Sequence, residues 1–345
     1  MNFNLTSIAD NLNQEKNPGS SIVFENLTML PAQPVVTIRC ITYNHVSLIS
    51  DTIEGFLAQK TDFPIEIIIH DDASSDGTAE IVRHYQQKHP NLIRAIFQSE
   101  NQWSQGKRPG QFLQGMTRGK YIAVCEGDDY WIDPLKLQKQ VDFLESHPDF
   151  SICCHGVTVV NDDGRPNFYI GPPVSNRNQY ELRDLCKSNF IVNCSTVYRN
   201  HLFDQRPLLL RNLAMGDWPL HILNAQHGKI WFIDENMAVY RAHSAGYWTG
   251  MDPIIRSQSA IDAIFKMNVY LEHKYEQEFN TAIFVHLLYI SNHYARQGMG
   301  RKAREYFWKC IHNFKYREQV SNTILLKSFI WAHFPKLINY LMGVK

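Results

Sequence analysis

The sequence lacks the features that would place it outside a reducing compartment. It has 7 cysteines but no CxxC pair, and most of them sit among apolar residues. They are therefore expected to be buried thiols and not a disulfide framework or a zinc site. Residues 1–33 show no basic stretch followed by an apolar run, so neither a signal peptide nor secretion is expected. We expect a cytoplasmic protein.

Two further absences concern partners. Lys+Arg 34 balances Asp+Glu 34, so no overall basic field would recruit nucleic acid. The stretch 324–342 is apolar but interrupted by Lys327, His333, Pro335 and Lys336, which makes it unsuited to span a bilayer. Its mixture of aromatic and basic residues suits a helix lying on anionic lipid, on the inner face of the cytoplasmic membrane. A helix buried in the protein explains the same pattern, and both readings stay open.

What is present is an alternation of strand and helix patterns. Apolar runs at 35–41, 65–70 and 121–125 have the length of buried strands, and the first two are followed by amphipathic helical patterns. Strands that alternate with helices imply right-handed crossovers and a parallel sheet, hence an α/β fold. The length of 345 residues allows one large domain of this kind plus an appendage.

Carboxylates follow two of these strands. Asp71 and Asp72 come directly after the second strand, and Asp128 and Asp129 come shortly after the third. Such residues also favour turns and helix caps, which is the plainer explanation for either pair taken alone. Two acidic strand ends in one sheet instead favour a site for a divalent cation and a diphosphate.

Three motifs carry a resemblance to a known family. The segments ITYNH at 41–45, HDDASSDGT at 70–78 and GKYIAVCEGDDYW at 119–131 arrive in the order typical of the family-two glycosyltransferases. The likeness covers 34–250 and implies the GT-A fold, a Rossmann-like, mainly parallel sheet flanked by helices. It also implies a domain plan: an N-terminal extension (1–33), a nucleotide-sugar half (34–130), an acceptor half (131–250) and a helical C-terminal region (251–345).

The resemblance assigns the donor site. A cation, Mn²⁺ or Mg²⁺, would be held by Asp129 and Asp128, with His243 completing the site. The nucleotide would be bound by residues at the strand ends and one arginine further along the chain, namely Thr42, Tyr43, Asn44, Asp71, Asp72, Asp128 and Arg241. Lys107 and Arg108 lie in the loop before the metal strand and could reach a phosphate, although solvated loop charges are the plainer expectation.

The resemblance also assigns the acceptor half. The family carries an acidic motif at the start of a helix, and Gly216-Asp217-Trp218 matches it with glycine in place of the first acid. Asp217 is therefore the expected catalytic base, although helix capping would explain its position equally well. Trp218 and Trp248 are expected to line the acceptor pocket. The Gln-x-x-Arg-Trp motif of processive synthases is absent, which implies one sugar per binding event.

The sequence thus predicts a metal-dependent, inverting glycosyltransferase. It would move a sugar from a nucleoside-diphosphate sugar, UDP being the expected nucleotide, to a glycan or lipid-linked glycan. A sugar-nucleotide nucleotidyltransferase is one alternative, but Thr42-Tyr43-Asn44 stands where its glycine-rich phosphate loop would be. A non-catalytic assembly protein on a transferase fold is the other, and the retained carboxylates argue against it.

Two helical expectations complete the picture. Asp133 and Pro134 are expected to begin a helix whose apolar residues share one face and whose Lys136 and Lys139 are solvated. The stretch 283–311 resembles one tetratricopeptide unit, with Gly298 in its turn and Ala303 in its packing groove. One such unit cannot stack alone, so it should pack on the catalytic domain or on a partner.

Overall fold

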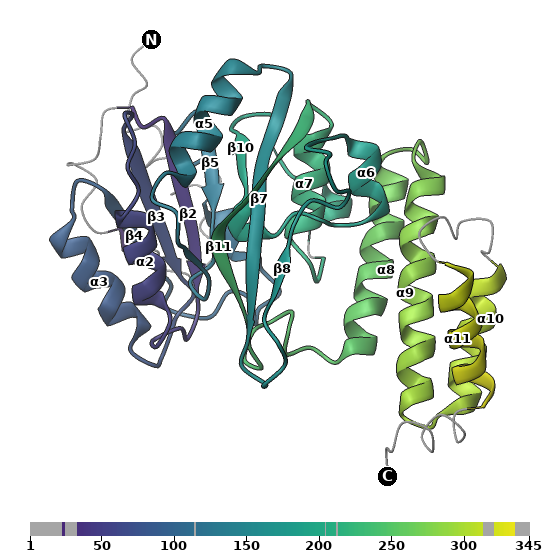
Figure 1. Ribbon diagram of the computed structural model, residues 1–345. Helices are drawn as coiled ribbons and strands as arrows, with labels where there is room; N and C mark the ends of the chain where they lie inside the picture. Colours follow the sequence, from purple (N-terminus) through teal and green to yellow (C-terminus); the bar gives the residue numbers. More distant parts are fainter. Residues whose placement is uncertain are drawn as a thin grey trace. The chain divides into compact units, whose positions relative to one another are not determined.

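A computed structural model describes the backbone of 23–24 and residues 33–113, 115–203, 205–211, 213–312 and 321–334. The chain divides after Pro134 into two compact units, each with its own strands and helices (Figure 1).

The first unit is built around parallel strands. Its strands follow the order β1-β4-β3-β2-β5, in which β2 to β5 run parallel and β1 is antiparallel to β4. Its elements are β1 (Val23–Phe24), β2 (Val36–Thr42), α2 (Ile49–Leu57), β3 (Ile65–Asp71), α3 (Thr78–Lys88), β4 (Ile93–Phe97), α4 (Pro109–Phe112), β5 (Tyr121–Val124) and β6 (Tyr130–Trp131). The three strands expected from their apolar runs are confirmed within a residue or two.

Burial explains why these strands read as unbroken apolar runs. The isoleucines of β3 at 67, 68 and 69 are fully buried, as expected for a strand covered on both faces. The helices α2 and α3 pack against each other beside this sheet (Figure 1). Strand β4 was not singled out from the sequence, where Arg94 interrupts its run. The Arg94 guanidinium is buried and donates to the Met116 carbonyl at 2.6 Å.

An ion pair with a buried carboxylate stabilises the sheet near the start of β3. The Glu66 side chain is fully buried and accepts from the Arg118 guanidinium at 2.6 and 2.9 Å. It also accepts from the Thr37 hydroxyl at 2.6 Å. The turn before β5 is thereby tied to β2 and β3.

The helix expected to begin at Asp133 and Pro134 begins later. In the structure α5 spans Lys136–Ser146 and has no side-chain cap. The carbonyls of Asp133 and Pro134 instead accept from the Gln59 amide and the Lys60 backbone at 2.9 and 2.8 Å, so these two residues serve the end of α2. The expected apolar face of α5 is confirmed, since Leu137, Val141 and Leu144 are buried.

Lys136 does not lie in solvent as expected. Its side chain is fully buried and donates to the Gln140 side chain at 2.8 Å. Gln140 in turn donates to the carbonyls of Cys153 and Ser195. This polar chain inside the second unit replaces water as the partner of the ammonium group, which permits burial of a charge. Lys139 pairs with Glu235 at 2.6 Å.

The second unit has its own strands and a set of C-terminal helices. Strand β7 is flanked by antiparallel β10 and parallel β11, while β8 pairs with β7 and β9 with β11, both antiparallel. Besides α5 the elements are β7 (Phe150–Asn161), β8 (Phe168–Ile170), β9 (Gln179–Tyr180), α6 (Leu182–Lys187), η1 (Asn193–Ser195), β10 (Val197–Arg199), η2 (Leu208–Leu210), α7 (Asp217–Ala225), β11 (Lys229–Ala242), α8 (Pro253–Tyr270), α9 (Glu276–Arg296), α10 (Gly300–His312) and α11 (Asn322–His333).

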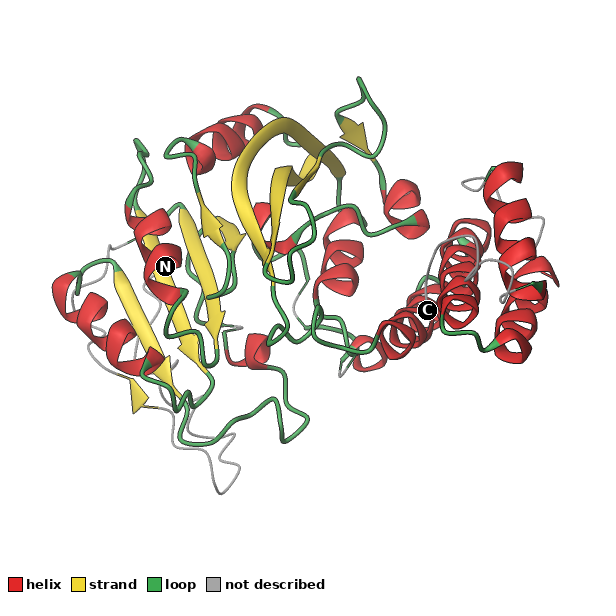
Figure 2. Cartoon of the chain, turned by 60° about the horizontal axis from the view of Figure 1, so that its bottom comes forward, coloured by secondary structure: helices red, strands yellow, loops and turns green. Residues whose placement is uncertain are grey.

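The helices α8 to α11 form a bundle at the end of the second unit (Figure 2). Helices α9 and α10 make the expected helix-turn-helix, with Gly298 at a φ of 74° in the turn and Ala303 fully buried. The bundle packs on the rest of its unit through α6, where Arg183 and Glu278 form an ion pair at 3.1 Å. The helix pair α9 and α10 thus belongs to a bundle that packs on its own compact unit.

All seven cysteines are buried and free. Among the described residues, no helix combines the length and the apolar character needed to cross a membrane. Of the stretch expected to lie on lipid, 324–342, the part from 335 onward is outside the described residues.

Candidate active site

The carboxyl ends of parallel strands bring the first group of predicted residues together. In the register of β2 and β3, Thr42 is the partner of Asp71, and the Asp72 backbone donates to the Thr42 carbonyl at 3.0 Å. Strand β5 lies on the other side of β2 and leads into the acidic segment 126–129. Three of the predicted motifs therefore meet at one edge of the sheet.

Gly127 allows the acidic segment to approach β2. A Cβ atom on Gly127 would lie 2.5 Å from the Thr42 hydroxyl and 3.0 Å from Nδ1 of His45. The Gly127 backbone donates to the Ile41 carbonyl at 2.9 Å. The Thr52 hydroxyl of α2 contacts the carbonyls of Gly127 and Asp129 at 3.0 and 2.6 Å. Only glycine fits this contact without displacement of the segment.

The two acids of the segment differ in accessibility. Asp129 is 2% exposed, whereas the Asp128 side chain is 19% exposed and lies 3.8 Å from Nε2 of His45. Burial raises the pKa of the Cys40 thiol in β2 well above its usual value, and the negative charges of the segment raise it further. These charges belong to Glu126, Asp128 and Asp129. This end of the sheet is thus strongly electronegative, and Asp128 and His45 offer oxygen and nitrogen ligands that fit a divalent cation. His45 was not singled out from the sequence, although it closes the ITYNH motif.

Asp71 and Asp72 also separate into two roles. Both oxygens of Asp72 are occupied, because they accept from the backbone of Gln102 and Trp103 at 2.9 and 3.0 Å. Asp72 therefore fixes the loop after β4. One oxygen of Asp71 accepts from the Ser74 backbone at 3.0 Å, while the other, Oδ1, is buried and has no partner among the described residues. Burial raises the pKa of Asp71.

An acceptor left unmet in this way is costly and marks a position where a ligand could donate. Asp71 is thus the better candidate of the pair for contact with a nucleotide.

The loop that carries Tyr43 and Asn44 is fastened to the loop after β3. Asn44 has a φ of 55°, its backbone donates to the Ser74 hydroxyl at 2.8 Å, and its side chain accepts from the Ser75 backbone at 2.9 Å. The side-chain oxygen of Asn44 is therefore engaged in holding the loop. Tyr43 is 44% exposed and available to a ligand.

The two cations before β5 have partners in their own loop, contrary to the expectation of solvated charges. The Arg108 guanidinium stacks on the Trp103 ring at 3.8 Å from its centre. Lys107 donates to the Gln102 side chain at 3.3 Å. Because Asp72 fixes the backbone of Gln102 and Trp103, these contacts place both cations relative to the end of β3.

The remaining predicted residues lie in the second unit. Asp217 is the first residue of α7, is partly exposed and accepts from the Asn189 amide at 3.0 Å. Trp218 is only 3% exposed and its indole donates to the Leu185 carbonyl at 2.9 Å, so it joins α7 to α6 and offers little surface to an acceptor. Arg241 lies at the end of β11, and His243 and Trp248 follow it; all three are partly exposed.

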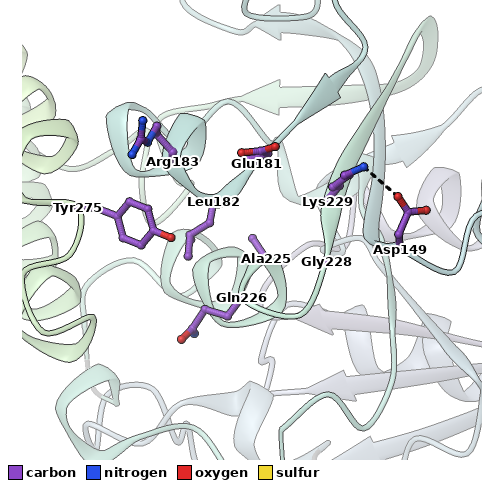
Figure 3. Close-up of a pocket in the computed structure, with 9 residues that line it drawn as sticks. All are labelled: Asp149, Glu181, Leu182, Arg183, Ala225, Gln226, Gly228, Lys229 and Tyr275. Atoms are coloured by element: carbon purple, nitrogen blue, oxygen red, sulfur yellow. Dashed lines mark hydrogen bonds and ion pairs between the residues drawn. The ribbon is translucent and has the colours of Figure 1, made fainter.

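A cavity in the second unit lies away from Asp217. It has a volume of about 580 Å³ and is lined where β7 and β11 begin and where α7 ends (Figure 3). Lys229 and Asp149 at its wall form an ion pair at 3.0 Å. Asp217 lies at the opposite end of α7, so this cavity is distinct from the predicted base.

Comparison with known proteins points to one family. Residues 37–206, just under half of the chain, match the family described as glycosyl transferase family 2. This stretch is similar to a family 2 glycosyltransferase domain. The matched stretch contains the predicted donor residues at the strand ends, while Asp217, Arg241, His243 and Trp248 lie beyond it.

Relatives and a solved structure agree with this assignment. The Mycobacterium tuberculosis protein Rv1520 is 41% identical over 214 residues, which are 62% of this chain and 60% of that protein. The putative teichuronic acid biosynthesis glycosyltransferase TuaG of Bacillus subtilis is 31% identical over 167 residues, covering 48% and 62%. The chain therefore spans about three fifths of the length of these curated relatives.

The fold matches that of S. aureus TarS 1-349, solved in complex with UDP-GlcNAc. The TM-score is 0.51 at 15% identity, over 87% of this chain and 92% of that one. This likeness confirms the GT-A fold expected from the motifs.

Proposed function

We propose that this family 2 domain transfers a sugar from a nucleoside-diphosphate sugar, with UDP as the nucleotide, to a hydroxyl group of a cell-surface glycan. The observation that carries the proposal is the edge formed by β2, β3 and β5. There the unmet oxygen of Asp71 and the acidic segment at Asp128 lie at the ends of the two strands that flank β2. Ligands of open α/β sheets bind at such edges.

In this proposal each residue has a task. Asp71 accepts a hydrogen bond from the nucleotide, and Thr42 and Tyr43 line the same edge. Asp128, with Asp129 and His45, holds Mn²⁺ or Mg²⁺. The family resemblance assigns Arg241 to the diphosphate and His243 to the cation. The cation, when bound, neutralises charge on the diphosphate.

Asp217 is the proposed base. It accepts the proton of the acceptor hydroxyl as that oxygen forms a bond to the anomeric carbon. The bond from this carbon to the diphosphate breaks on the opposite side, which inverts the configuration and releases the nucleoside diphosphate with the bonding electron pair. Trp248 is proposed to line the acceptor site.

The proposed class of acceptor is based on the names of two relatives. TuaG is named for teichuronic acid biosynthesis, and the Escherichia coli protein WfaP, 32% identical over 117 residues, is named as a glucosyltransferase acting on a diphosphoundecaprenol-linked sugar. These names support a glycan acceptor carried on a lipid.

A lipid-linked acceptor would require the enzyme to work at the cytoplasmic membrane face. Among residues 300–345 there are nine lysines and arginines but two acids, although the whole chain is neutral. Trp308 of α10 and Leu326 and Phe329 of α11 are exposed. We propose that this part of the bundle contacts anionic lipid.

Calorimetry tests the donor site. UDP and GDP should each be titrated with and without Mn²⁺ into the wild type, Asp128→Asn, Asp129→Asn and the control Asp142→Asn in α5. The proposal expects metal-dependent UDP binding that Asp128→Asn abolishes and the control retains. Metal-dependent binding that survives in both Asp128→Asn and Asp129→Asn would refute the assignment.

A further inference from the structure

Asn189 makes the hydrogen bond that the structure provides to the Asp217 carboxylate. It follows α6, and its Nδ2 donates to Oδ2 of Asp217 at 3.0 Å. The other oxygen of Asp217 has no partner among the described residues. A carboxylate bonded on one oxygen has a fixed orientation and keeps its second oxygen available.

The amide of Asn189 has a single favourable orientation. Its own oxygen is buried and accepts no hydrogen bond within the described part of the chain. Rotation of the amide by half a turn would bring that oxygen against the Asp217 carboxylate, where two acceptors repel. The present orientation leaves a buried acceptor unmet, which costs stability. An apolar residue would avoid that cost, so packing alone does not explain asparagine here.

The surroundings of Asn189 include one packing contact, one neutral histidine and one guanidinium. Trp218 ties the α6 end to α7 through the Leu185 carbonyl at 2.9 Å. His221, one turn after Asp217, is fully buried, and burial lowers its pKa to about 4, so it is neutral at pH 7. The Arg206 guanidinium donates to the Gly216 carbonyl at 3.1 Å.

We propose that Asn189 is the positioning residue of the catalytic base. Its amide holds Oδ2 of Asp217 and so orients the carboxylate with Oδ1 toward the acceptor hydroxyl. The inference rests on the proposed role of Asp217 and adds a residue that lies within the family match at 37–206.

The test compares Asn189→Ala and Asn189→Asp with Asp217→Asn and with the control Asn200→Ala, another asparagine of the same unit. The first readout is the infrared carboxylate band that disappears in Asp217→Asn, which needs no knowledge of the acceptor. Loss of the amide donor in Asn189→Ala should shift the frequency of this band, whereas Asn200→Ala should leave it unchanged. Asn189→Asp keeps the shape of the side chain but supplies no amide donor, so it should shift the band as well.

The second readout is transfer, measured as release of the nucleoside diphosphate. Asn189→Ala should lower kcat about tenfold with unchanged donor KM. An unchanged band and an unchanged kcat in both Asn189 variants overturn the inference and leave the base assignment intact. Full transfer by Asp217→Asn would instead remove the base assignment itself, so the two failures are distinguishable.

Discussion

Gly127→Ala probes whether the acidic segment must touch β2. The added Cβ would lie 2.5 Å from the Thr42 hydroxyl and 2.7 Å from its Cβ, about 1 Å inside ordinary contact. Thr42 is β-branched and 1% exposed, so it cannot rotate away cheaply. Moving the segment would strain the bonds from Gly127 to Ile41 and from Thr52 to Gly127. We expect a loss of about 1–3 kcal/mol in the free energy of unfolding.

The same displacement should reach the ligands. A shift of about 1 Å at Asp128 can cost a factor on the order of 10² in function, so Mn²⁺-dependent UDP affinity should fall at least tenfold. Gly110→Ala is the matched control, because its Cβ would meet Arg39 and Ile41 only at ordinary distances of 3.5 and 3.8 Å. Chemical denaturation and calorimetry measure the two effects. Wild-type stability and affinity in Gly127→Ala would refute the claim that glycine is required here.

Four further changes test other parts of the account. Asp217→Asn should keep donor affinity but lose about 10²–10⁴-fold in transfer rate, and loss of donor binding as well would count against a role as base. Glu66→Ala should cost about 2–4 kcal/mol of stability because it removes a fully buried carboxylate and leaves the buried Thr37 hydroxyl without its acceptor, whereas Glu80→Ala, at an exposed pair, should change it by less than about 0.5 kcal/mol; equal losses would contradict this. Burial lowers the pKa of His70 from 6.5 to about 4, so the unfolded chain binds a proton that the folded one does not, and stability should fall as pH falls through this window; His70→Gln should reduce the slope by up to one proton, and an unchanged slope would show that His70 is not the cause. Leu326→Glu should weaken co-sedimentation with anionic vesicles while Leu208→Glu, even more exposed elsewhere in the unit, should not; a wild type that ignores vesicles would end the membrane proposal.

The fold of the first unit was predictable because its strands are buried on both faces. Unbroken apolar runs such as the one in β3 give the strand directly, and the polar residues after each run give its carboxyl end. Strand β4 was missed because Arg94 breaks the pattern, and its burial depends on the distant Met116 carbonyl. The start of α5 was also misplaced. The Asp133 carbonyl accepts from the Gln59 side chain at the end of α2, and no local pattern reveals this contact.

The candidate site was predictable in composition but not in the division of tasks. The sequence motifs did not distinguish Asp71 from Asp72 as nucleotide-binding residues. Only the hydrogen bonds from the loop after β4 show that both carboxylate oxygens of Asp72 already have donors. Burial, likewise, separates Asp128 from Asp129 and removes Trp218 from the surface. Asn189 carried no signal in the sequence, because its role depends on the packing of α6 against α7.

The most direct test of the central claim is release of nucleoside diphosphate from a panel of UDP-, GDP- and dTDP-sugars, with and without Mn²⁺, in the presence of lipid-linked and free glycan acceptors. Mass spectrometry of the acceptor should follow each reaction. The account predicts metal-dependent release of UDP together with one added sugar per acceptor, and loss of both in Asp128→Asn and Asp217→Asn. Release of pyrophosphate with formation of a sugar nucleotide, or no turnover of any donor, would contradict it.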